Sequence, residues 1–171
     1  MHFQKNIKLK MNKLIYLLIV CLAFFNCTGQ EPTSFSDAAL NDTFIDLQGE
    51  EVTFKDILQA HKGQTIVIDI WASWCKDCIS GMPKVKVLQQ AHQEVVYIFL
   101  SLDKSQEAWK KGIEKYDVNG THYFMQSGWK GDFGSFVNLD WIPRYMVIDK
   151  EGNIKVFKAV EADDKKIKDV L

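Results

Sequence analysis

The segment from residue 65 to residue 78 constrains the fold more than any other part of this 171-residue chain. Thr65–Ile70 (TIVIDI) is an almost continuous run of β-branched residues, which is typical of a strand buried on both faces of a partly parallel sheet. A short turn follows, and Cys75 and Cys78 begin a stretch with apolar residues at helical spacing. The spaced residues are Ile79, Met82, Val85 and Leu88. The pattern predicts a strand, a turn and a helix that starts at the two cysteines.

The rest of the chain alternates strand and helix patterns, except over residues 118–141, where no period is clear. The order is a hairpin and then β-α-β-α-β-β-α, which predicts one α/β domain whose helices flank a central mixed sheet. The expected elements are a hairpin over 43–54, a short helix ending near residue 63, strands over 65–70, 95–102, 144–148 and 154–160, and helices over 75–92, 106–116 and 163–170.

The first 26 residues carry a targeting pattern. They contain four lysines and no acidic residue, and residues 14–25 (LIYLLIVCLAFF) form an apolar run of twelve. A membrane span needs roughly 20 apolar residues, so the basic flank and short run predict a secretory signal peptide over residues 1–26. A start at Met11 would leave this signal complete, and an uncleaved signal anchor is the alternative.

The remaining chain is acidic. Removing residues 1–26 leaves 21 − 4 = 17 basic and 22 acidic residues, a net charge of −5. This balance excludes a nucleic-acid partner and a basic patch for a membrane surface.

Cys27 directly follows the apolar region, and it resembles the lipidation site of bacterial lipoproteins, where such a cysteine becomes the acylated first residue. Cys21, inside the apolar run, is the rival site, and an unmodified thiol at Cys27 is the other alternative. We therefore expect a lipid anchor at Cys27, a polar tether over 27–37 and a folded domain over 38–171. The domain would lie on the periplasmic or extracytoplasmic side of the membrane.

Two cysteines, Cys75 and Cys78, are left for the folded domain. They do not make a disulfide framework, which needs several spaced pairs. A zinc site needs a second ligand pair, and His61, His92 and His122 have no such spacing. Ile79 follows Cys78, so the haem-attachment pattern Cys-x-x-Cys-His is absent. A redox motif remains, with no metal or other cofactor expected.

Residues 71–78 (WASWCKDC) are similar to the active-site segment of thioredoxins, and the chain from about residue 35 resembles the membrane-tethered TlpA/ResA-like branch of the thioredoxin superfamily. Cys75 and Cys78 match the redox pair of that family. Asp69 matches a buried carboxylate six residues earlier, and Pro83 matches the proline that bends the active-site helix. Ile142-Pro143 matches the segment of the cis-proline that faces the disulfide.

The resemblance implies a thioredoxin-like fold with an N-terminal β-hairpin extension and an insertion before the cis-proline. It also implies an enzyme that exchanges disulfides with exported proteins, more often as a reductant, and that is recycled by a membrane electron donor or acceptor. Cys75 would attack the substrate, Cys78 would resolve the mixed disulfide, and Asp69 would accept the proton of Cys78. A polar residue that merely reaches water at a strand end is the alternative for Asp69.

Substrate-binding residues implied by the resemblance are Trp74, Ile142 and Pro143, whereas Trp71 is expected to pack beneath the motif. Arg144 either touches the substrate or is an ordinary exposed strand residue. The aromatic residues of the unassigned segment form either a substrate surface or a core beneath an insertion; they are Tyr123, Phe124, Trp129, Phe133, Phe136 and Trp141.

Lys76 and Asp77 lie between the two cysteines, and Asp77 departs from the proline that most relatives carry at its position. The redox potential is therefore left open. The main alternative function is a copper metallochaperone that holds Cu(I) between thiolates. Such proteins with this fold space their cysteines by three residues and add a distal histidine. A peroxide-reducing enzyme lacks support because the segment Pro-x-x-x-Thr-x-x-Cys is missing, and the intact cysteines argue against a catalytically inactive lipoprotein.

Overall fold

A computed structural model describes residues 30–171, within which Pro32–Leu171 form a compact unit. The predicted signal peptide and Cys27 lie outside the described residues. Within residues 30–171, no helix has the length and apolar character needed to cross a membrane.

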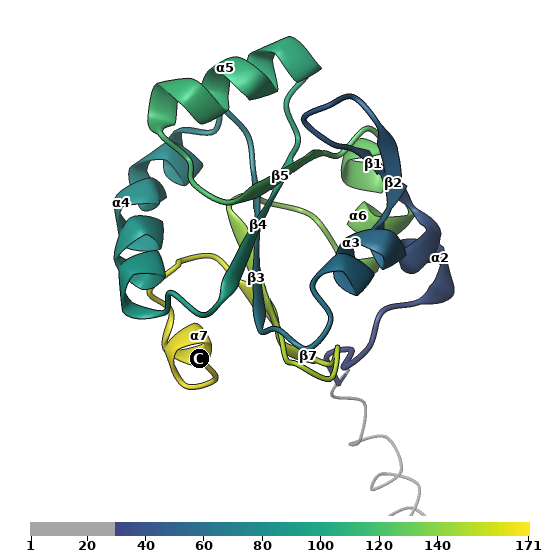
Figure 1. The fold of residues 1–171 in the computed structure, drawn as a ribbon, viewed down its shortest axis with the longest axis vertical. Helices are drawn as coiled ribbons and strands as arrows, with labels where there is room; N and C mark the ends of the chain where they lie inside the picture. Colours follow the sequence, from purple (N-terminus) through teal and green to yellow (C-terminus); the bar gives the residue numbers. More distant parts are fainter. Residues whose placement is uncertain (1–29) are drawn as a thin grey trace, which may run out of the picture. The chain divides into compact units, whose positions relative to one another are not determined.

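A seven-stranded mixed sheet forms the centre of the unit, in the order β2-β1-β5-β4-β3-β6-β7 (Figure 1). Strands β3, β4 and β5 run parallel to one another, whereas β6 pairs antiparallel with β3 on its other side. The predicted architecture, a mixed sheet flanked by helices, is confirmed. The strands are β1 Thr43–Ile45, β2 Glu51–Thr53, β3 Ile66–Trp71, β4 Val96–Ser101, β5 Thr121–Phe124, β6 Arg144–Ile148 and β7 Ile154–Ala159.

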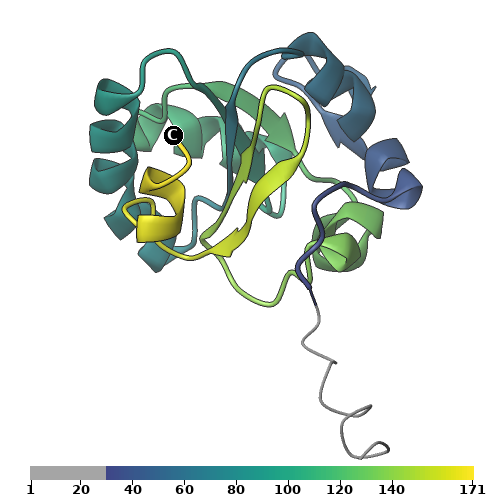
Figure 2. The ribbon, with the colours of Figure 1, turned by 90° about the horizontal axis from the view of Figure 1, so that it is seen from below.

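Helices cover both faces of the sheet. Helices α4, α5 and α7 lie on one face, and α2, α3 and α6 lie on the other (Figures 1 and 2). Right-handed crossovers explain why α4 and α5 share a face, because β3, β4 and β5 are successive parallel neighbours. The helices are α2 Asp37–Asn41, α3 Phe54–Ala60, α4 Lys76–Ala91, α5 Gln106–Tyr116, α6 Asp132–Phe136 and α7 Lys165–Lys168, with a 3-10 turn η1 at Gly128–Lys130.

The start of the described chain is part of the fold. Phe35 packs on Phe54 and Phe136, with ring centroids 4.8 and 5.4 Å apart. The Thr33 carbonyl accepts a hydrogen bond of 2.8 Å from the Ile154 backbone N–H. The compact unit therefore begins at Pro32, six residues before the predicted boundary at residue 38.

The hairpin, the four other predicted strands, the short helix before β3 and the two long helices are found close to their predicted ranges. Four short elements were missed: α2, β5, η1 and α6. Each has only three to five residues, too few to show a period. The last helix is shorter than the predicted range of 163–170. It starts later because Asp164 caps it by accepting a hydrogen bond from the Lys166 backbone N–H.

Helix α5 approaches the turn after β3 closely through Gly112. A Cβ atom there would lie 2.5 Å from Ser73 Cβ and 3.4 Å from the Trp71 ring. The glycine is therefore required by packing, although α-helices disfavour it. In α4, by contrast, a Cβ on Gly81 would meet only the Tyr145 hydroxyl at 3.6 Å.

These two helical glycines make a matched pair for mutation. Gly112→Ala should lower the free energy of unfolding by about 1–3 kcal/mol because it overpacks the junction of α5 with the turn. Gly81→Ala should leave it unchanged or raise it by up to about 1 kcal/mol through helix propensity. Urea denaturation of both variants measures the difference, and equal effects would contradict the close approach at Gly112.

Candidate active site

The two cysteines lie where β3 gives way to α4. They form a disulfide with a Cα–Cα distance of 5.3 Å. Cys75 is the N-cap of α4, and its Sγ accepts a hydrogen bond of 3.1 Å from the Cys78 backbone N–H. The unpaired N–H groups and the dipole of a 16-residue helix favour negative charge at this end. A thiolate on Cys75 would therefore be stabilised.

The two sulfur-bearing residues differ in exposure: Cys75 is 6 % exposed and Cys78 is 1 % exposed. Lys76 and Asp77, the residues between them, are both exposed in the first turn of α4. This order of exposure is what an attacking Cys75 and a resolving Cys78 require, because a substrate must reach only the first of them.

Asp103, at the end of β4, holds the turn that precedes the disulfide. Its carboxylate accepts hydrogen bonds from the backbone N–H and the hydroxyl of Ser73, at 3.1 and 2.6 Å, and from the Ser101 hydroxyl at 2.9 Å. The sequence analysis missed this residue. The sequence pattern that could have indicated Asp103 is an acidic residue directly after a buried parallel strand. Such a residue lies at the sheet edge where functional groups gather in α/β proteins.

The Ile142–Pro143 peptide bond is cis, as the resemblance implied. It lies opposite the disulfide, with the Ile142 carbonyl oxygen 3.7 Å from Cys75 Sγ. The fold thus brings together two segments that are 67 residues apart in the chain.

A cavity of about 390 Å³ opens beside Cys75. Trp74 and Trp141 form part of its lining and are 52 % and 59 % exposed. Trp71 is fully buried beneath the motif, as expected. Among the aromatic residues of the unassigned segment, Trp129 and Trp141 line the cavity, whereas Phe133 belongs to the core. The full lining is Trp74, Cys75, Lys76, Asp77, Trp129, Asp140, Trp141 and Ile142.

Asp69 lies in the middle of the sheet, and its side chain is not a strand-end group that reaches water. It is 3 % exposed, and neither carboxyl oxygen has a hydrogen-bond partner among the described residues. It pairs with Tyr145 across β3 and β6, so both side chains occupy the same face of the sheet. The Tyr145 hydroxyl lies close to Gly81 of α4, so Asp69 faces the helix that carries Cys78.

Burial is the main cause that raises the pKa of Asp69 to about 8, and the neighbouring Tyr145 hydroxyl opposes this shift. Between about pH 4 and pH 8, where an exposed aspartate is ionised, this carboxyl group is therefore mostly protonated in the folded protein. A group that gains and loses its proton near neutral pH is suited to proton transfer.

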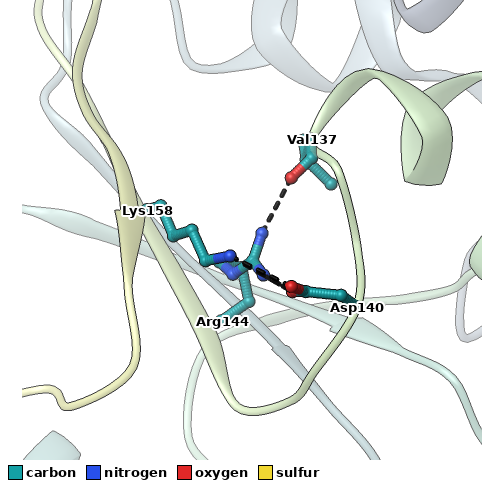
Figure 3. A network of polar contacts seen from close by, with 4 residues as sticks. All are labelled: Val137, Asp140, Arg144 and Lys158. Atoms are coloured by element: carbon teal, nitrogen blue, oxygen red, sulfur yellow. Dashed lines mark hydrogen bonds and ion pairs between the residues drawn. The ribbon is translucent and has the colours of Figure 1, made fainter. Parts of the chain in front are cut away.

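Arg144 is fully buried, which contradicts the alternative of an exposed strand residue. It lies beneath the loop of residues 137–143 (Figure 3). As for metal sites, no group of three or more His, Cys, Asp or Glu side chains that could hold an ion occurs within residues 30–171.

A protein-family model described as thioredoxin-like matches residues 63–154, more than half of the chain. The chain therefore belongs to the thioredoxin-like family. This agrees with the mixed sheet, the Cys-x-x-Cys pair at a helix start and the facing cis-proline.

Named relatives define the class further. The thiol-disulfide oxidoreductase ResA of Bacillus cereus is 26% identical over 160 residues, which cover 85% of this chain and 87% of the relative. The thiol:disulfide interchange protein DsbE of Pasteurella multocida is 27% identical over 164 residues, 89% and 86% of the two chains. The chain thus combines the fold and the cysteine pair with similarity to thiol–disulfide oxidoreductases.

Solved structures of thiol–disulfide oxidoreductases have a similar fold. A thiol:disulfide interchange protein from a Bacteroides species is 26% identical, with a TM-score of 0.60 over 79% of this chain and 85% of that one. A thiol-disulfide oxidoreductase from Bacteroides fragilis has a TM-score of 0.65 over 79% of this chain and 100% of that one. It is 18% identical, so this second likeness concerns the fold alone.

The buried carboxyl group predicts an unusual dependence of stability on pH. The folded state keeps a proton on Asp69 up to about pH 8, whereas the unfolded chain loses it near pH 4. Between these values the folded state binds more protons, so its stability falls as pH rises, by at most roughly 1.4 kcal/mol per pH unit.

Asp69→Asn should remove this loss, so that the variant becomes increasingly more stable than wild type between pH 4 and pH 8. Urea denaturation of the oxidised proteins, with the Cys75–Cys78 disulfide intact, measures the free energy of unfolding at several pH values. Asp77→Asn, which replaces an exposed carboxylate, is the control and should retain the wild-type slope. If the free energy of unfolding depends on pH in the same way in wild type and in Asp69→Asn, the pKa of Asp69 is not raised by folding.

Proposed function

We propose that this protein is an extracytoplasmic thiol–disulfide oxidoreductase that reduces disulfides of exported proteins through Cys75 and Cys78. The observation that carries the proposal is the position of the pair: a disulfide at the N-terminus of α4, 3.7 Å from the carbonyl before a cis-proline and beside an open cavity lined by tryptophans.

In the first step, the Cys75 thiolate of the reduced protein attacks one sulfur of a substrate disulfide. The substrate S–S bond breaks, its other sulfur leaves as a thiolate that takes up a proton, and a mixed disulfide forms on Cys75. The helix N-terminus and the Cys78 backbone N–H favour the thiolate form of Cys75.

In the second step, Cys78 loses its proton and attacks Cys75 Sγ. The Cys75–Cys78 disulfide forms, and the second substrate sulfur is released as a thiol, so that two electrons pass to the substrate. In this proposal the ionised fraction of Asp69 accepts the proton of Cys78, because the carboxyl group faces α4 and exchanges its proton near neutral pH. A thiol donor on the membrane then supplies two electrons to restore the dithiol.

The charge next to the pair supports the reducing direction of this proposal. Asp77 places a negative charge two residues from Cys75, where most relatives have an uncharged proline, and Lys76 offsets it only in part. Less stabilisation of the thiolate favours the disulfide form of the pair, and this makes the dithiol a stronger reductant.

Substrate binding is assigned to Trp74, Ile142 and Pro143. Trp74 presents an exposed ring beside Cys75, and Ile142 contributes to the opposite wall of the cavity. An extended peptide that carries a cysteine can lie between these two walls with its sulfur at Cys75.

Export and anchoring rest on the sequence of the first residues. We assign residues 1–26 to a signal peptide and Cys27 to lipidation, which would hold the domain at the outer side of the membrane. Because the compact unit begins at Pro32, the tether between Cys27 and the domain would be only four residues long. The active site would then stay close to a membrane electron donor.

The two cysteines should differ in mutant phenotype. Cys75→Ser should abolish the reduction of insulin and form no mixed disulfide, because the attacking thiolate is missing. Cys78→Ser should trap insulin covalently on Cys75, because nothing resolves the intermediate. Non-reducing gel electrophoresis detects the trapped species, and trapping by Cys75→Ser instead would reverse the assignment. If the wild-type protein oxidises reduced peptides but leaves insulin intact, the proposed direction of electron transfer is wrong.

The anchor is tested separately. Metabolic labelling with a palmitate analogue should mark the full-length protein and should be lost in Cys27→Ala, because acylation needs this thiol. Cys21→Ala is the matched control and should be labelled like wild type. Labelling that persists in Cys27→Ala would place the anchor elsewhere.

A further inference from the structure

Arg144, the only arginine of the chain, follows the cis-proline directly. Its guanidinium group is fully buried and makes two hydrogen bonds to the preceding loop (Figure 3). Nη1 donates to the Val137 carbonyl oxygen at 2.7 Å, and Nη2 donates to Asp140 Oδ1 at 2.5 Å. The remaining nitrogen, Nε, has no partner among the described residues. The two bonds thus tie the beginning of β6 to residues 137 and 140.

The loop of residues 137–143 forms one wall of the active-site cavity. Asp140, Trp141 and Ile142 line the cavity, and the Ile142 carbonyl oxygen approaches Cys75 Sγ to 3.7 Å. The backbone N–H groups of residues 138 and 139 donate to the carbonyl oxygens of Ser135 and Gly134, which both belong to α6. Between residue 139 and β6, no backbone–backbone hydrogen bond holds the loop.

We propose that Arg144 is a positioning residue for the substrate-binding wall: by bridging the Val137 carbonyl and the Asp140 carboxylate, it holds Trp141 and Ile142 beside Cys75. This role rests on the proposed disulfide exchange with protein substrates. Arg144 itself touches neither the sulfur atoms nor the cavity, so it acts through the loop.

The chemistry of the contacts explains why an arginine is needed. The two acceptors are three residues apart, and a planar guanidinium presents donors to both at once. A lysine ammonium would keep the charge but is a compact point charge on a flexible stem. It would leave one buried acceptor without its partner and the loop free to shift. Burying this charge is costly, so its presence under the loop calls for a role that an apolar residue could not fill.

Variants of Asp140 and Lys158 provide a second test of the role of Arg144. Asp140 is exposed, with 67% of its side chain accessible, and Lys158 of β7 lies 3.2 Å from the same Oδ1. Asp140→Asn keeps the size of the side chain but weakens the bond to Arg144 without emptying the core. Lys158→Met removes the other cation, which lies outside the loop and the cavity, and an exposed ion pair of this kind contributes little.

Two disulfide substrates distinguish a loss of substrate positioning from a loss of thiolate reactivity. Insulin is a protein substrate that contacts the wall of the cavity, whereas bis(2-hydroxyethyl) disulfide carries no peptide and reacts with the thiolate alone. Single-turnover reactions of the reduced full-length protein are followed by acid quenching and thiol labelling, over a range of insulin concentrations. The half-saturating insulin concentration and the limiting rate are thereby obtained separately.

Arg144→Lys should raise the half-saturating insulin concentration on the order of tenfold, with the limiting rate and the rate with the small disulfide within about twofold of wild type. Asp140→Asn should shift the same quantity in the same direction by a smaller factor, and Lys158→Met should match wild type. If Arg144→Lys fails to fold, as judged by circular dichroism, Asp140→Asn decides.

Wild-type half-saturation in both loop variants would overturn the proposal, and so would an equal loss with both disulfides, which would indicate a general structural defect. Wild-type protein that reduces neither disulfide would instead remove the proposed function, and the role of Arg144 with it. Wild type that reduces the small disulfide but not insulin would remove the protein-substrate class on which this role rests.

Discussion

The site depends on the pairing of β3 with two different neighbours. All six residues of β3 are buried, and the strand runs parallel to β4 but antiparallel to β6. Antiparallel pairing brings the start of β6 beside the end of β3, with Ile70 opposite Arg144. The turn that carries Cys75 and the segment that carries the cis-proline must therefore meet at one edge of the sheet. The helix N-terminus needed for a reactive thiolate follows β3 directly, so it lies at the same edge.

Three buried ionisable side chains lie at or below this edge, and their surroundings differ. Asp103 is surrounded by donors from Ser73 and Ser101, which makes it a structural anchor for the turn. Arg144 is paired with acceptors on the loop. Asp69 has only the Tyr145 hydroxyl as a polar neighbour and no charged partner among the described residues, and burial raises its pKa. Unpaired burial of an ionisable group is costly, and such groups cluster at functional sites. The contrast supports a chemical role for Asp69 and supporting roles for the other two.

The segments beyond the central strands shape the surroundings of the pair. Strand β5 extends the sheet on one side, and Gly112 of helix α5 lies against the turn at Ser73. The segment after β5 provides Trp129 and the loop with Trp141, which line the cavity beside Cys75. At the N-terminus, Phe35 and Thr33 bind the first described residues to the domain. Of these segments, the one after β5 lines the cavity beside the redox pair.

The sequence by itself determined the order of the main elements, the redox pair and the proline that faces it, because long periodic runs and fixed motif offsets depend on neighbours along the chain. The Thr65–Ile70 run and the spacing after Cys75 were sufficient for β3 and α4. Short elements such as β5 could not be predicted, since four residues show no period and gain stability only from the strands beside them. The tertiary structure alone decided which polar residues are buried and which are paired. Asp103 and Arg144 find their partners through contacts made by folding, and Trp71 and Trp74, three residues apart, are separated into core and surface by the turn between them.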